Sequence, residues 1–228
     1  MSRTIIVSNR LPIKISNLDK SFEFSSTSGG LATGMKSIHK KNNFLWIGWP
    51  GIDKKSLGDN LNKAKKLLLK KNYIPVFLRK KEINDFYYGI SNEALWPLFH
   101  YFIEFSKFNK SHWASYVNVN KKFADCVIKY AKKGDIVWVH DYQLLLCPKI
   151  IKNKRPDLTV GFFLHIPFPS FEIFRIFPWR EKLLEGILGS DLIGFHTYDY
   201  VRHFLSSVKR ILRYDVIFNK IIVGSREV

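Results

Sequence analysis

The sequence predicts an α/β protein built on a doubly wound, mainly parallel sheet. Short, continuous apolar runs recur along the 228 residues, as strands covered on both faces of a parallel sheet require. Longer segments with apolar residues at helical spacing lie between these runs. Neither an internal repeat nor a Gly/Ser-rich linker breaks the alternation. We therefore expect one domain over residues 1–228.

Six apolar runs are the expected strands of this sheet. Each is short, contains β-branched or aromatic residues, and ends at polar or turn residues. They cover residues 4–8, 44–51, 73–78, 136–139, 160–164 and 191–195. Two further segments, 11–28 and 215–223, resemble antiparallel hairpins, so we expect one such excursion near each end of the chain.

Helices are predicted in the connections, where apolar residues recur every three or four positions. The expected helices span residues 35–40, 56–71, 80–88, 113–133, 142–152, 171–188 and 198–212. In this prediction Ser91 starts a further helix, and Pro178 breaks the helical segment that contains it. Cys126 and Cys147 fall in helical patterns without CxxC spacing, so we expect buried free thiols in a reducing compartment.

Composition excludes a disordered chain and a membrane-spanning one. Hydrophobic residues make up 46% of the chain and aromatic residues 15%, enough for a large core. No apolar run approaches the roughly 20 residues that cross a bilayer. The apolar run at the start is too short for the core of a signal peptide. We therefore expect a cytoplasmic protein that does not contact a membrane.

The formal charge of +18 can arise in two ways. It can mark an anionic partner, such as nucleic acid, a membrane surface or a phosphorylated metabolite. It can also mark a solvated, lysine-rich surface. The 27 lysines outnumber the 10 arginines and are spread in pairs over several predicted helices. A nucleic-acid binder groups its cations and aromatic residues on one face, so we expect no nucleic-acid partner.

Polar residues follow two predicted strands at the point where each strand ends. His140 and Asp141 follow the strand over 136–139, and His165 follows the strand over 160–164. A single histidine or aspartate there is most often a satisfied core residue or a loop cap. Ligands of open parallel sheets bind just beyond the carboxyl ends of the strands, however, so three such groups at one edge predict a site.

Two more segments fit a ligand site. Asn9 and Arg10 follow the first strand, and Gly29 and Gly30 precede the helix predicted over 35–40. Glycines let a backbone approach a ligand, and a helix N-terminus offers free N–H groups to an anion. The spacing is not GxGxxG, so an ordinary turn is the alternative.

Several motifs resemble the trehalose-6-phosphate synthase family. They are IIVSNRLP at 5–12, SGGL at 28–31, WIGW at 46–49, SNxxLWP at 91–97, YVxVN at 116–120, VHDY at 139–142, GFFLHIPFP at 161–169 and LIGF at 192–195. Their order and spacing agree with the family along essentially the whole chain. The resemblance implies the amino-terminal, Rossmann-like domain of a two-Rossmann (GT-B) glycosyltransferase. Such an enzyme transfers glucose from UDP-glucose to glucose 6-phosphate with retention, and uses no metal or other cofactor.

The resemblance implies an acceptor site made of one arginine and several aromatic residues. Arg10 resembles the arginine that holds the acceptor phosphate, and Tyr87 resembles a second contact to that phosphate. Trp96 resembles an aromatic wall of the acceptor pocket, and Trp46 and Trp49 are further candidates for that wall.

The resemblance also implies groups close to the transferred sugar. Asp141 resembles the carboxylate that binds acceptor hydroxyls, and His165 resembles the active-site histidine near the transferred glucose. Gly29 and Gly30 resemble the loop that closes over the donor.

One departure from the family limits what this chain can do alone. The family's donor-binding domain follows in the chain and supplies the cations that hold the UDP diphosphate, whereas this sequence stops at Val228. We therefore expect an acceptor half that is inactive without that domain. Assembly with identical copies stays open. The alternatives are another two-Rossmann glycosyltransferase, or a non-catalytic module that binds glucose 6-phosphate or another anion.

Overall fold

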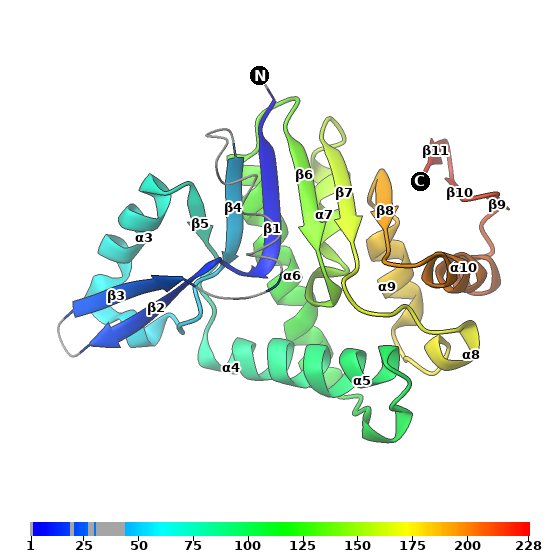
Figure 1. Cartoon of the computed structure of the whole chain (residues 1–228), viewed down its shortest axis with the longest axis horizontal. Coiled ribbons are helices and arrows are strands. Elements are labelled where there is room, and N and C mark those ends of the chain that lie inside the picture. Colours follow the sequence, from blue (N-terminus) through cyan, green and yellow to red (C-terminus); the bar gives the residue numbers. More distant parts are fainter. Residues whose placement is uncertain (1, 19–20, 27–29, 31–43) are drawn as a thin grey trace.

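The computed structural model describes residues 2–18, 21–26, 30 and 44–228. Its centre is a six-stranded sheet in the order β5-β4-β1-β6-β7-β8, in which every neighbouring pair is parallel (Figure 1). The strands are β1 (Thr4–Arg10), β4 (Phe44–Trp49), β5 (Tyr73–Pro75), β6 (Ile136–His140), β7 (Thr159–Phe163) and β8 (Leu192–Gly194). The predicted fold class and all six expected strands are confirmed.

The path of the chain through this sheet fixes where a ligand can bind. From β1 the chain moves outward through β4 to β5, then returns to the other side of β1 and continues through β6, β7 and β8. The strand order therefore reverses between β1 and β6. In open α/β sheets the crevice beyond the carboxyl ends of the strands at such a reversal is where ligands bind.

Helices fill the connections as predicted, with one difference. They are α3 (Leu61–Lys70) after η1 (Lys55–Asn60), α6 (Lys110–Tyr130), α7 (Cys147–Lys154) after η4 (Tyr142–Leu144), α8 (Phe171–Phe174), α9 (Arg180–Ile187), and α10 (Tyr198–Ser207) continued by η5 (Val208–Leu212). A short turn of helix, η3 (Ile103–Phe105), precedes α6. The helix expected over 35–40 lies outside the described residues.

The difference is a single long helix where two were expected. It comprises α4 (Lys80–Glu82), the π-helix η2 (Ile83–Leu95) and α5 (Trp96–Phe99) without a break. Ser91 was expected to start a new helix, but its hydroxyl donates to the carbonyl oxygen of Phe86 at 2.8 Å. The hydroxyl therefore satisfies a carbonyl inside the helix instead of capping a helix end. Wide π turns of this kind occur often at functional sites.

The two predicted hairpins are also confirmed. Near the start, β2 (Ile13–Leu18) and β3 (Ser21–Ser26) pair antiparallel. Near the end, β10 (Lys220–Val223) pairs antiparallel with both β9 (Val216–Ile217) and β11 (Arg226–Glu227).

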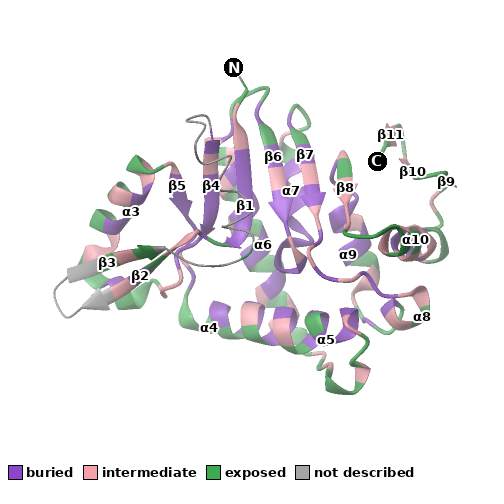
Figure 2. Cartoon of the chain, viewed as in Figure 1, coloured by how far each residue is buried: buried purple, intermediate pink, exposed green. Residues whose placement is uncertain are grey.

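The middle of the sheet lies in the core, and β1 and β4 are buried over most of their length (Figure 2). Side chains of β1 alternate between two hydrophobic clusters. Ile5 and Val7 belong to the larger cluster, which also holds Phe123 of α6, whereas Ile6 belongs to the smaller one with Leu68 of α3. Successive side chains of a strand point to opposite faces, and burying each one stabilises the fold by about 1.5–3 kcal/mol. This packing holds the ends of the strands in fixed positions.

The cysteines are free, as expected. Cys147 is buried, whereas Cys126 on α6 is only half-buried. Burial raises the pKa of both thiols. None of the helices in the described ranges is long and apolar enough to cross a membrane.

Candidate active site

The carboxyl end of β1 presents an arginine on an aromatic support. The guanidinium carbon of Arg10 lies 4.4 Å from the centroid of the Trp49 ring. The Tyr87 ring lies beside the Trp49 ring, with the two centroids 6.3 Å apart. The Trp49 indole donates to the carbonyl oxygen of Ile52 at 2.8 Å, which holds its plane. Arg10 is exposed, and within the described part of the chain no carboxylate pairs with it. The arrangement presents a solvent-facing guanidinium whose donors are available to an anion.

Backbone contacts explain why Arg10 lies where it does. The Ser8 hydroxyl accepts a bond from Trp46 Nε1 and donates to the Arg10 carbonyl oxygen, both at 2.7 Å. Gly48 lets β4 approach this turn, because a Cβ atom there would lie 2.7 Å from the Leu11 nitrogen and 2.9 Å from the Arg10 carbonyl carbon. Trp46 itself is 1% exposed, so its indole supports Ser8 from the core and offers no open face to a sugar.

At the carboxyl end of β6, Asp141 occupies a strained conformation. Its backbone has φ 74° and ψ 170°, a region that residues other than glycine rarely adopt and that costs about 1–3 kcal/mol. Two bonds hold it: its amide donates to the Phe163 carbonyl oxygen at 2.8 Å, and its Oδ1 accepts from the His165 amide at 3.1 Å. Burial raises the pKa of this carboxyl to about 6. These two bonds therefore hold the carboxylate at the edge between β6 and β7 and stabilise the strained backbone of Asp141.

A pair of neutral histidines lies beside Asp141. His140 Nδ1 and His165 Nε2 are 3.0 Å apart. Burial lowers the pKa of His140 to about 3, with a smaller contribution from His165. It lowers the pKa of His165 to about 4, with a smaller contribution from His196. Both rings are therefore uncharged at pH 7, with one donating to the other. The His196 ring lies next to that of His165, with the two ring centroids 5.8 Å apart.

A proline-containing loop follows His165. Residues 164–170 contain neither helix nor strand, and no peptide bond of the segment is cis. Pro167 and Pro169 each push the preceding residue toward extended conformations. The loop therefore leaves the sheet directly and keeps His165 at the strand end.

The long helix α4–η2–α5 runs beyond the carboxyl ends of the strands (Figure 1). The Tyr142 hydroxyl donates to Asn92 Oδ1 at 3.1 Å, which ties the helix to the segment following Asp141. Tyr87 and Trp96 both belong to this helix. Trp96 is 41% exposed and stacks on the His100 ring with centroids 4.1 Å apart. It is the most exposed of the three candidate tryptophans, because Trp46 and Trp49 are buried.

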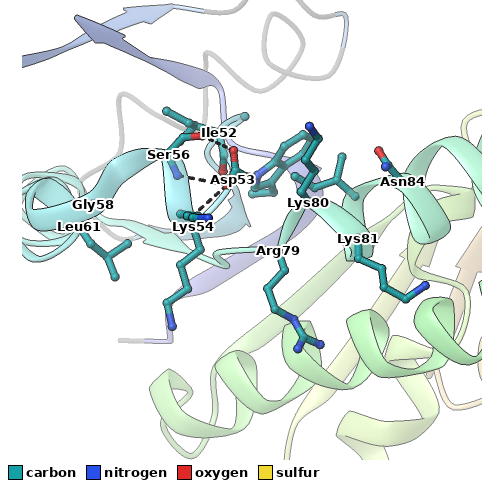
Figure 3. Close-up of a pocket in the computed structure, with 14 residues that line it drawn as sticks. Ile52, Asp53, Lys54, Ser56, Gly58, Leu61, Arg79, Lys80, Lys81 and Asn84 are labelled. Carbon is teal, nitrogen blue, oxygen red and sulfur yellow. Dashed lines mark hydrogen bonds between the residues drawn. The ribbon is translucent and has the colours of Figure 1, made fainter. Parts of the chain in front are cut away.

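A basic cleft of about 1360 Å³ adjoins Trp49 (Figure 3). Its lining includes five cationic side chains, those of Lys54, Lys55, Arg79, Lys80 and Lys81. The carboxylate in the lining is Asp53, whose pKa is lowered chiefly by its hydrogen bond with the Ser56 hydroxyl. The sequence shows these lysines only as two of many scattered pairs. The fold brings them together because the loop after β4 faces the start of α4.

Two predicted site residues remain, Gly29 and Gly30. Gly29 lies outside the described residues. Gly30 is exposed, and a Cβ atom there would meet nothing within 4 Å. In the described ranges no cluster of three or more His, Cys, Asp or Glu side chains could hold a metal ion. The structure thus gathers Arg10, Trp49 and Tyr87 in one cluster and Asp141 and His165 in a second.

Sequence comparisons identify the relatives of this chain. Residues 2–228 match the model of Glycosyltransferase family 20. The chain is 45% identical over 216 residues to a UDP-forming alpha,alpha-trehalose-phosphate synthase of Candida albicans, covering 92% of this chain and 45% of that protein. It is 48% identical over 213 residues to synthase A of Dictyostelium discoideum, covering 92% of this chain and 28% of that protein.

Solved structures share the fold. The N-terminal domain of Candida albicans trehalose-6-phosphate phosphatase is 28% identical, with a TM-score of 0.83 over 100% of this chain and 47% of that one. A Burkholderia xenovorans synthase in complex with glucose-6-phosphate is 25% identical, with a TM-score of 0.79 over 99% of this chain and 48% of that one. The chain spans less than half the length of these relatives. The family match covers the strands, the strand-end groups and the long helix alike, and this chain therefore belongs to glycosyltransferase family 20.

Proposed function

We propose that this chain is the acceptor side of a UDP-forming trehalose-phosphate synthase, which transfers glucose from UDP-glucose to glucose 6-phosphate. The observation that carries the proposal is Arg10, an exposed guanidinium without a carboxylate partner among the described residues that lies on Trp49 beside Tyr87. The names of the relatives support the reaction, and the complex of the Burkholderia xenovorans protein with glucose-6-phosphate supports the acceptor.

Each group at the acceptor side has a role that suits its chemistry. The Arg10 guanidinium can bond two phosphate oxygens at once, and the Tyr87 hydroxyl can donate to a third. The basic cleft next to Trp49 adds a positive field that attracts an anionic acceptor. Trp96 offers its exposed ring to the pyranose. Trp49 is only 4% exposed, so we assign it the support of Arg10 rather than contact with the sugar.

The groups at β6 and β7 suit the reacting end of the sugars. Asp141 is mostly ionised at pH 7 and can accept bonds from sugar hydroxyls. His165 is uncharged, so it can donate to or accept from a hydroxyl of the glucosyl group without adding charge. The acceptor hydroxyl forms the new bond to the anomeric carbon of the donor while the bond to UDP breaks. We infer transfer with retention, in which the departing UDP takes the acceptor proton.

The donor diphosphate needs further cations, which we assign to a second domain. Loss of a single preorganised donor typically lowers the rate about 10²- to 10³-fold, and loss of a whole set of cations lowers it further. Proximity between donor and acceptor is lost as well. We therefore propose that the 228-residue chain binds the acceptor but does not turn over by itself.

Calorimetric titration with glucose 6-phosphate and with glucose tests the acceptor proposal. We expect the phosphate ester to bind more tightly, by a few kcal/mol, because charge-assisted bonds to Arg10 are absent with glucose. Arg10→Ala should remove this preference. Arg202→Ala is the matched control, since Arg202 is 61% exposed and pairs with Asp199 on α10. Equal affinity for the two sugars in the unmodified chain would refute the proposal.

A second candidate function is a non-catalytic module that binds glucose 6-phosphate. The fold likeness to the N-terminal domain of a trehalose-6-phosphate phosphatase favours it, because that domain belongs to a protein named for a different activity. Adding a donor-binding domain from a full-length synthase separates the two candidates. Release of UDP from UDP-glucose and glucose 6-phosphate in that mixture supports the enzyme, and its absence supports the module.

A further inference from the structure

A second cationic site lies away from β1, around Phe171. Three arginines line a hollow of about 430 Å³ there, together with Phe171, Glu181 and Ile211. Arg175 follows α8, Arg180 starts α9, and Arg210 lies in η5. Three separate elements thus direct arginines to one small space, which sequence spacing does not reveal.

The Phe171 ring orders two of these guanidiniums. The guanidinium carbon of Arg210 lies 4.8 Å from the ring centroid, and that of Arg175 lies 5.7 Å from it. Such contacts between a cation and an aromatic ring restrict an otherwise flexible side chain. The arginines are therefore partly preorganised before any ligand arrives.

Within the described part of the chain, most donors of the three guanidiniums have no partner. Arg175 and Arg210 share one carboxylate, Glu172, at long distances of 3.4 and 3.5 Å. Arg180 donates to the Phe177 carbonyl oxygen at 3.3 Å. Each guanidinium has five N–H donors, so these weak bonds leave most of them unused. A simple ion-pair network would hold shorter contacts and more carboxylates.

We propose that this hollow binds a small phosphate-bearing ligand through Arg175, Arg180 and Arg210. Guanidinium groups bond two oxygens of a phosphate at once, and their charge is retained at every pH of interest. The volume suits a phosphate group with a small substituent. The site is distinct from the Arg10 cluster, since none of its lining residues belongs to that cluster.

Titration calorimetry with inorganic phosphate and with glycerol phosphate tests the proposal. Measurements on the whole 228-residue chain at about 0.15 M salt screen the general attraction of its +18 charge. We expect saturable binding that Arg210→Gln or Arg180→Gln weakens about tenfold or more, because each removes a charge-assisted pair. Tighter binding of the ester than of inorganic phosphate identifies a phosphomonoester as the ligand class, and equal binding identifies free phosphate.

Two matched controls separate binding in this hollow from general charge attraction and from binding at Arg10. Arg202→Gln removes the same charge from an exposed position on α10 and should change the affinity less than twofold. The same titrations on chains that also carry Arg10→Ala exclude binding of glycerol phosphate at the acceptor site, which keeps this test independent of that site. Arg210→Lys keeps the charge without the planar fork and should lose part of the affinity. Absence of saturable binding, or equal weakening by Arg202→Gln and Arg210→Gln, would overturn the proposal.

Discussion

Replacing Asp141 by asparagine should make the protein more stable at pH 7 while weakening its acceptor site. Asparagine keeps an oxygen that can accept the bond from the His165 amide at 3.1 Å, and its side chain has nearly the same shape as that of aspartate, so the backbone strain is unchanged. It removes the carboxylate charge, which burial disfavours. The substitution therefore isolates the energetic cost of that charge.

The magnitude follows from the raised pKa. Burial moves the pKa of Asp141 from its usual 3.8 to about 6. Each pH unit between these values corresponds to about 1.4 kcal/mol, so complete ionisation costs the folded state about 3 kcal/mol at most. Because Asp141 is only half-buried, solvent screening reduces this cost, and we expect about 1–3 kcal/mol.

The pH dependence has a defined sign. Between the two pKa values the folded chain binds the Asp141 proton more tightly than the unfolded chain does, so this group's contribution to the free energy of unfolding falls as the pH rises from about 4 to about 6. His140 and His165 act in the opposite direction, because their lowered pKa values cost stability as the pH falls below about 6.5. Subtracting the free energy of unfolding of the unmodified chain from that of the variant cancels the contribution of the two histidines.

Urea unfolding at a series of pH values from about 4 to about 7 provides the assay. The stability gained by Asp141→Asn should grow from near zero at the acidic end to its full value at pH 7. Asp157→Asn is the control of opposite sign, because the hydrogen bond from Arg155 lowers the pKa of Asp157. A difference that stays constant with pH, or a variant that is less stable at pH 7, would refute the reasoning.

Two further predictions concern the geometry around Arg10 and the donor side of the proposed reaction. Gly48→Ala should cost about 1–3 kcal/mol and weaken glucose 6-phosphate binding, because its Cβ atom would lie 2.7 Å from the Leu11 nitrogen. Gly161→Ala in β7 is the matched control, with its nearest contact at an ordinary 3.6 Å, and thermal unfolding with titration would compare the two. If both variants behave alike, the close approach at Gly48 does not position Arg10. The chain alone should release no UDP from UDP-glucose and glucose 6-phosphate above the uncatalysed rate, and robust release would show that its own residues bind the donor.

Local patterns in the sequence were enough to predict the fold. Continuous apolar runs mark strands that are buried on both faces, and helical spacing marks the layers that cover them. All six sheet strands and both hairpins could be placed in this way. The positions of Asp141 and His165 at strand ends also follow from the sequence, because the carboxyl ends of parallel strands share one edge.

Other features were decided only by the tertiary structure, because they depend on which segments meet. The sequence predicts a helix start at Ser91, but packing of the long helix against α6 and the strand ends keeps it continuous through π turns. Trp46 and Trp49 look equivalent in the sequence and both are buried, yet they belong to different hydrophobic clusters and only Trp49 lies under the Arg10 guanidinium.

The positions of the charged side chains were likewise decided by the tertiary structure. The lysines of the basic cleft come from the segment after β4 and from the start of α4, which α3 and β5 separate in the sequence. The arginines around Phe171 come from three elements. Composition reveals the total charge but not its location, since the folded path alone sets the distances over which charges act. The strained backbone of Asp141 likewise depends on bonds to β7, which no local pattern around residue 141 contains.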